Sequence, residues 1–167
     1  MQKRLIIYDV DAPDGQDFFP ADGDTLVFPA APPIRHCVGC FGCWVKTPGK
    51  CVIKDRAGVL PAWLAQCGEL ILVSPILYGG YSRNVKAALE RSIGFLLPFF
   101  RIVNGEMHHQ MRQENPFKLT ACFYGPCGAG EQDIARRLVR ANAVNFGAGS
   151  CSVAFFDTAQ ELREAVL

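Results

Sequence analysis

Short, continuous apolar runs are the feature of this sequence that most constrains its fold. Three stand out and two weaker ones follow the same pattern: Arg4–Val10, Glu69–Leu77, Leu119–Gly125, Ser152–Asp157 and Thr25–Pro29. Their apolar residues are mostly consecutive rather than alternating with polar ones, which is typical of strands that are covered on both faces. The runs therefore predict five buried strands in one sheet.

Helical patterns separate the predicted strands. Before Pro98, apolar residues recur at three- and four-residue steps, and the proline is expected to end that helix. The predicted helices are Gly58–Gln66, Val85–Leu97, Glu131–Phe146 and Thr158–Val166. Strands that alternate with helices indicate an α/β fold with a parallel sheet. Because no segment resembles a linker, residues 1–167 are expected to form a single domain.

The connection between the first two strands differs from the others. Residues 11–24 are numerous enough for a crossover helix, but helix breakers interrupt them throughout, at Pro13, Gly15, Pro20 and Gly23. We therefore expect the first crossover helix to be shortened or absent.

Residues 98–118 form the longest stretch without a clear period. Long ordered loops are often functional or lie at interfaces, so this segment, with Phe99 and Phe100, is the candidate subunit contact. Glu106, His108 and His109 lack the one-face spacing of a metal-binding helix, and we expect a polar loop there.

Composition excludes several classes of protein. Half of the 167 residues are hydrophobic and the formal net charge is +1, so neither a disordered chain nor a basic surface for nucleic acid is expected. No apolar run reaches the roughly 18 residues that span a bilayer, and the N-terminal run is too short for a signal peptide. The absence of a P-loop and of G-x-S-x-G gives hydrolase chemistry no support. We expect a cytoplasmic globular protein without membrane or nucleic-acid partners.

Cysteines are the chemically distinctive residues. Four of the eight, Cys37, Cys40, Cys43 and Cys51, follow a C-x2-C-x2-C-x7-C spacing, and glycines between them permit tight turns. Four converging thiolates suit an iron–sulfur cluster or tetrahedral zinc. Free or redox-active thiols and, less readily, disulfides are the alternatives. Three of the other four, at 67, 122 and 151, fall in or beside predicted helices and strands and are expected to be small core residues, whereas Cys127 lies in a glycine-rich segment after a predicted strand.

Two glycine-rich segments stand where a predicted strand passes into a helix. In an open parallel sheet, ligands bind at the carboxyl ends of strands, and glycines there permit close backbone approach. Tyr78 and Tyr81 offer flat surfaces to a ring system, and Ser82 or Asn84 is positioned to cap the next helix. A plain strand–turn–helix is the alternative. The candidate cofactor-binding residues are Pro75, Ile76, Leu77, Tyr78, Gly79, Gly80, Ser82, Tyr124, Gly125, Gly128 and Gly130.

The segment Cys37–Asp55, CVGCFGCWVKTPGKCVIKD, resembles the cysteine segment of the NAD(P)H-dependent FMN reductase-like flavoproteins, including the iron–sulfur flavoproteins. The stretch SPILYGGYSRNVKAALER resembles the strand-end loop and following helix of that family, and the likeness runs from about Pro33 to the C-terminus. It implies a flavodoxin-like three-layer sandwich with strand order 2-1-3-4-5, FMN at the carboxyl edge, NAD(P)H as electron donor, and homodimers or homotetramers. It also implies a [4Fe–4S] cluster on the four clustered cysteines. Because these cysteines begin after the second predicted strand, we expect them at the same edge of the sheet as the two glycine-rich segments.

The first strand departs from the family pattern. Where the family has G-S-P-R-x-x-S/T to cradle the FMN phosphate, this chain has Asp9, Asp11 and Asp14, whose carboxylates would repel a phosphate. The leading prediction is a flavin-dependent oxidoreductase or electron-transfer flavoprotein. The alternatives are a non-enzymatic flavodoxin-like binding or assembly module that has lost FMN binding, and a thiol reductase that uses Cys37 and Cys40.

Overall fold

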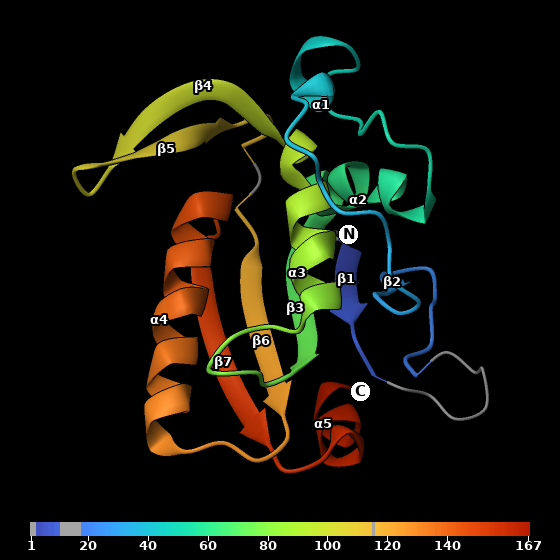
Figure 1. Ribbon diagram of the computed structural model, residues 1–167, viewed down its shortest axis with the longest axis vertical. Helices are drawn as coiled ribbons and strands as arrows, with labels where there is room; N and C mark the ends of the chain where they lie inside the picture. Colours follow the sequence, from blue (N-terminus) through green and yellow to red (C-terminus); the bar gives the residue numbers. More distant parts are fainter. Residues whose placement is uncertain (1–2, 11–17, 115) are drawn as a thin grey trace.

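The computed structural model describes residues 3–10, 18–114 and 116–167. Its main sheet has five parallel strands in the order β2-β1-β3-β6-β7, which counts as 2-1-3-4-5 among these five (Figure 1). They are β1 (Lys3–Tyr8), β2 (Thr25–Pro29), β3 (Cys67–Pro75), β6 (Lys118–Tyr124) and β7 (Ser150–Phe156). The predicted flavodoxin-like arrangement is confirmed, and all five predicted strands are present within about two residues of their expected bounds.

The sheet is the middle of three layers because its strands bury both faces. Leu5 and Ile7 belong to the larger core, under three helices, whereas Ile6 and Tyr8 belong to a smaller core on the opposite face. The helices over the larger core are α2 (Leu60–Gln66), α3 (Arg83–Arg91) and α4 (Ala129–Phe146), and α5 (Ala159–Val166) covers the other face. The continuous apolar runs are therefore the signature of two-sided burial.

Capping side chains and a left-handed glycine define the ends of several helices. The Ser82 side chain accepts a hydrogen bond from Val85 N at the start of α3, as expected, and the Thr158 hydroxyl accepts one from Glu161 N at the start of α5. Gly147 ends α4 in the left-handed conformation with φ 66°. A short 3₁₀ turn, η1 (Arg56–Val59), precedes α2, so the helix predicted over Gly58–Gln66 begins as a tighter turn.

The helix predicted over Val85–Leu97 is too long at its C-terminal end. α3 ends at Arg91, where the Ser92 hydroxyl donates to Ala88 O, and the chain continues in a 3₁₀ turn, η2 (Ile93–Phe95). Pro98 does not end the helix, because it already lies in the next strand. The apolar spacing persists past the helix because the following residues also face the core.

The segment predicted as a loop over residues 98–118 is largely a β-hairpin. β4 (Leu96–Val103) and β5 (Glu106–Met111) form a separate antiparallel pair that arches over the end of α4 (Figure 1). Asn104 and Gly105 join them with φ 53° and 82°, as in a type I′ turn. An Asn-Gly pair is a strong hairpin signal, and the irregular polar and aromatic residues around it obscured the strands.

The first crossover lies partly outside the described residues. Residues 18–24 contain no helix, whereas residues 11–17 are among those not described, so the shortened helix remains a prediction. Phe19 is fully buried in the smaller core with Leu162 of α5, and it covers the sheet face near β1. Within the described residues, no helix combines the length and the apolar character needed to cross a bilayer.

Candidate functional site

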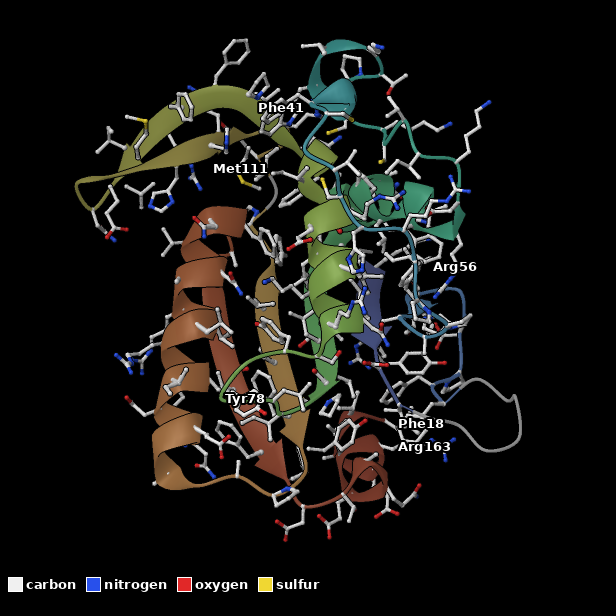
Figure 2. All side chains as sticks on the ribbon, viewed as in Figure 1. Phe18, Phe41, Arg56, Tyr78, Met111 and Arg163 are labelled. Atoms are coloured by element: carbon white, nitrogen blue, oxygen red, sulfur yellow. The ribbon has the colours of Figure 1, made fainter. Side chains whose placement is uncertain are left out.

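The loop after β3 is a tight turn that exposes one aromatic ring. Leu77 and Gly80 exchange two backbone hydrogen bonds of 3.0 and 2.9 Å, and the two residues between them are left-handed, with φ 51° at Tyr78 and 75° at Gly79. The turn leaves Tyr78 93% exposed, at the position labelled in Figure 2. This ring is therefore presented to solvent beside the carboxyl end of β3.

Close packing fixes the position of this turn. A Cβ on Gly79 would lie 2.7 Å from Ile134 Cβ and 2.8 Å from Glu131 O, both on α4, so no larger residue fits. At the other end of the loop, Ser82 N donates to Ser74 Oγ over 2.7 Å. The loop is thus held against α4 and β3 and needs no ligand to define its shape.

The second glycine-rich segment lies directly beside the first. Tyr124 is in register with Pro75, and Ile76 N donates to Tyr124 O over 2.9 Å. Gly128 and Gly130 are exposed, and a Cβ on either would meet no atom within 4 Å, so this backbone is open to an approaching ligand. The structure therefore brings the predicted cofactor-binding residues of both segments to one edge of the sheet.

Tyr81 behaves differently from Tyr78. Its ring stacks on Phe123 with centroids 5.3 Å apart and an interplanar angle of 24°. Burial raises the pKa of Tyr81 to about 12. Of the two tyrosines expected to offer flat surfaces, only Tyr78 does so, because Tyr81 turns into the fold.

Asp9 is the described part of the expected phosphate region. Its Oδ1 accepts a hydrogen bond from Asn84 Nδ2 over 3.1 Å, and its backbone carbonyl accepts one from Tyr124 Oη over 2.8 Å. A carboxylate thus stands between the end of β1 and the start of α3. Residues 11–15, which include Asp11 and Asp14, lie outside the described residues.

The four clustered cysteines surround a shared cavity. The segment that carries them includes a single-turn helix, α1 (Gly42–Val45), whose Trp44 Nε1 donates to Leu96 O over 3.1 Å. A Cβ on Gly42 would lie 2.6 Å from Val52 Cγ1, so the segment folds tightly on itself. The side chains that line the cavity, about 70 Å³ in volume, include those of Cys37, Cys40, Cys43 and Cys51.

The thiols do not converge on a single point. Among the described residues, no three His, Cys, Asp or Glu side chains are grouped closely enough to hold one metal ion. Burial raises the pKa of the Cys43 thiol, and the neighbouring Cys51, Cys37 and Cys40 raise it further. No disulfide joins any of the eight cysteines, so the disulfide alternative finds no support in the structure.

Arg91 forms part of the wall of this cavity. It is 1% exposed, and its guanidinium donates to both carboxylate oxygens of Asp55 over 2.7 and 2.8 Å and to the backbone of Arg35 and Ile53. These bonds lower the pKa of Asp55. Arg91 Nε is buried without a hydrogen-bond partner, and Arg91 lines the cysteine cavity. Sequence reasoning missed this residue because an arginine within a helix carries no signal of its buried partners.

The cysteines and the two glycine-rich loops do not share an edge of the sheet, contrary to expectation. Cys43 packs on Gly94, beyond the C-terminal end of α3, whereas the exposed turn precedes the N-terminus of that helix. α3 has nine residues and is therefore about 13 Å long. After β2 the chain runs back along the sheet, and Figure 2 accordingly shows Phe41 and Tyr78 far apart.

The three cysteines outside the cluster that were expected in the core, and the two neighbouring histidines, differ in their surroundings. Burial raises the pKa of Cys67 to about 12 and that of Cys122 to about 11, as fits core thiols, whereas Cys151 is only half-buried. His108 and His109 lie on β5 rather than in a loop, and neither joins a metal-binding group among the described residues.

Comparison with known proteins agrees with this fold. No protein-family model matches the chain. An iron–sulfur flavoprotein of Methanocaldococcus jannaschii is 35% identical over 68 residues, and the match covers 38% of this chain but only 34% of that relative. The chain therefore matches about a third of the length of this curated relative.

Solved structures align over nearly the whole chain. An FMN-dependent NADH-azoreductase from Bacillus anthracis, in complex with FMN, has a TM-score of 0.58 at 11% identity, with 99% of this chain and 97% of that chain covered. An NADH:FMN oxidoreductase in its apo form has a TM-score of 0.55 at 9% identity, with 98% and 86% covered. The solved structures share the flavodoxin-like fold of this chain, and the matched segment is similar to part of an iron–sulfur flavoprotein.

Proposed function

We propose that this protein is a flavin-dependent oxidoreductase that binds FMN at the carboxyl edge of its sheet and accepts reducing equivalents from NAD(P)H. The observation that carries the proposal is the pairing of two glycine-rich loops, joined by the Ile76–Tyr124 hydrogen bond, beside the exposed ring of Tyr78. The names of the similar proteins, an iron–sulfur flavoprotein, an FMN-dependent azoreductase and an NADH:FMN oxidoreductase, agree with it.

The residues of this edge fit a flavin ring. Bound FMN supplies the hydride chemistry, and the protein supplies orientation and electrostatics. The rigid turn at Tyr78 and Gly79 offers an aromatic face, and the open backbone at Gly128 and Gly130 permits close approach to the ring. We propose that the flavin contacts residues from Pro75 to Ser82 and from Tyr124 to Gly130.

The phosphate end of the flavin has a weaker anchor. Because the Asp9 carboxylate lies at the end of β1, the ring and not the phosphate would provide most of the binding energy. FMN is therefore expected to bind no more tightly than riboflavin. Asp9→Asn is expected to tighten FMN binding about fivefold, since one repulsive charge is removed at roughly 1 kcal/mol, and to leave riboflavin binding unchanged.

These affinities also decide between two candidate functions, the flavin-dependent reductase and the non-enzymatic binding module. Asp9 is the observation that favours a non-enzymatic module, because its charge opposes the phosphate. Fluorescence titration of both flavins measures the affinities. If neither flavin binds to wild type or to Asp9→Asn, the module is supported and the reductase is not. If FMN binds to wild type much more tightly than riboflavin, the interpretation of Asp9 is wrong.

For the cysteine cavity we propose a [4Fe–4S] cluster. Thiolates are the ligands that such clusters require, and all four predicted ligands line one cavity. Among the described residues, no three side chains are grouped as ligands of one ion, so the arrangement gives a single zinc ion no support. The partnerless Nε–H of Arg91 offers a donor to a sulfur ligand, and hydrogen bonds of this kind tune cluster potentials.

Anaerobic reconstitution with ferrous iron and sulfide tests the cluster. Wild type is expected to develop broad visible absorbance and to retain about four iron atoms per chain. Cys51→Ser is expected to lose most of both, whereas Cys151→Ser, a change to a half-buried thiol on β7, is expected to behave as wild type. Equal iron retention by the two variants would contradict the assignment and leave free thiols as the alternative.

A further inference from the structure

A large cavity lies on the side of α3 and α4 that faces the hairpin. Its volume is about 610 Å³, within the range of about 300–1,000 Å³ found for small-molecule pockets. The hairpin of β4 and β5 forms one wall, and Figure 1 shows it arching over the end of α4 beside α3. Apolar side chains predominate, among them Leu89, Ile93, Phe100, Leu138 and Phe146.

Unsatisfied polar atoms gather around this cavity. Among the described residues, four buried side-chain nitrogen or oxygen atoms have no hydrogen-bond partner, and three of them belong to residues that line it: Tyr81 Oη, His108 Nε2 and His109 Nδ1. Because such atoms are rare in folded proteins, their concentration at one apolar cavity indicates a partner that the chain itself does not supply.

The neighbours of these atoms do not satisfy them. Asn142 lies near the Tyr81 hydroxyl without a hydrogen bond of acceptable geometry. The side chain of His108 is 9% exposed; its Nδ1 is 2.9 Å from Asn145 Oδ1, and its Nε2 is 3.4 Å from Glu106 Oε2 without a hydrogen bond. Unpaired groups of this kind destabilise the empty cavity and favour a ligand that completes their bonds.

We propose that this cavity binds a small, neutral aromatic molecule that carries a hydroxyl group, such as a phenol or naphthol. Aromatic rings at Phe100, His109 and Phe146 provide stacking surfaces for a planar ligand. A hydroxyl group both donates and accepts, so it can pair with the Tyr81 hydroxyl and with either histidine tautomer. Lys86 and Glu90 contribute opposite charges to the lining, which gives no net preference for a charged ligand.

This cavity adjoins the proposed flavin site at Gly80, which lines the cavity and belongs to the glycine-rich turn. Tyr78 projects into solvent from the turn and is not among the residues that line the cavity. Tyr81, three residues later, turns inward and lines it. A ligand can therefore occupy this cavity whether or not a flavin is bound at the Tyr78 turn.

Calorimetric titration with 1-naphthol tests the proposal, with naphthalene as the probe that lacks the hydroxyl. Wild type is expected to bind one 1-naphthol per chain, with or without saturating FMN. Tyr81→Phe removes only the phenolic oxygen and is expected to weaken 1-naphthol binding about fivefold without changing naphthalene binding. Tyr78→Phe removes the same oxygen from the exposed turn and is the matched control, with no expected change.

Leu138→Trp provides a second variant because it fills the cavity from α4, and it is expected to abolish 1-naphthol binding. Absence of 1-naphthol binding to wild type below 1 mM would overturn the proposal. Displacement of the probe by FMN, or equal weakening in Tyr78→Phe and Tyr81→Phe, would assign the probe to the flavin loop and overturn it as well.

Discussion

At the scale of single residues, the sequence predicts candidate site residues only where residues of one type recur at short spacing. The cysteine spacing and the paired glycines are visible in sequence, and the structure brings each set together. Arg91 and Asp55 are 36 positions apart and share no motif, yet they form the buried pair beneath the cysteine segment. Such long-range partners depend on tertiary packing, so their chemistry becomes visible only in the fold.

The Arg91–Asp55 pair should make stability depend on pH. Asp55→Asn is expected to lower the free energy of unfolding by about 3 kcal/mol at pH 7, because the buried guanidinium loses its counter-charge. Since the pKa of Asp55 is lowered in the folded state, its contribution is complete above the unfolded value of about 3.9 and is lost as the pH falls through the folded value.

Urea unfolding under reducing conditions at pH 7, 5 and 3 measures this effect. The difference in free energy of unfolding between wild type and Asp55→Asn should be similar at pH 7 and 5 and smaller at pH 3. Asp133→Asn, which removes an exposed pair with Arg137, is the control and should cost less than about 1 kcal/mol. A difference that is independent of pH, or no larger than that of the control, would contradict this role.

At the scale of elements, the sequence correctly predicts the strands and helices that pack on the core. It misplaces the elements that extend away from the core. The five sheet strands and α4 have regular apolar patterns because they face a large core. The hairpin has one face turned to solvent and a short Asn104–Gly105 turn, so its pattern is diluted by polar residues. It also carries exposed apolar side chains, including Phe99, Ile102 and Met107.

These exposed side chains give the hairpin its predicted role as a subunit contact. Ile102 and Met107 are paired across the two strands and are 68% and 66% exposed. The double change Ile102→Glu with Met107→Glu is expected to convert an oligomer to monomers. Leu167→Glu, at a residue that is 63% exposed on the C-terminal end, is the control. Light scattering after size exclusion checks this, and an unchanged mass in the double variant would place the contact elsewhere.

At the scale of the whole molecule, strand order and layering follow from the alternation of apolar runs and helices. The position of the cysteines does not follow from this alternation, because the long segment after β2 contains no strand that would fix its direction. It returns along the sheet to the far end of α3, and Arg56 holds its start through hydrogen bonds to the carbonyls of Pro29, Ala30 and Pro32. The molecule therefore separates its two proposed redox sites by at least the length of one helix.

Titration of FMN fluorescence with the protein tests whether the paired glycine loops bind a flavin ring. Gly128→Leu places a side chain into open space at the proposed ring site, and Gly58→Leu does the same on the 3₁₀ turn η1, away from it. We expect saturable 1:1 quenching by wild type and by Gly58→Leu, with binding weakened at least tenfold in Gly128→Leu. Absence of FMN binding to wild type, or equal affinity in both variants, would contradict flavin binding at these loops.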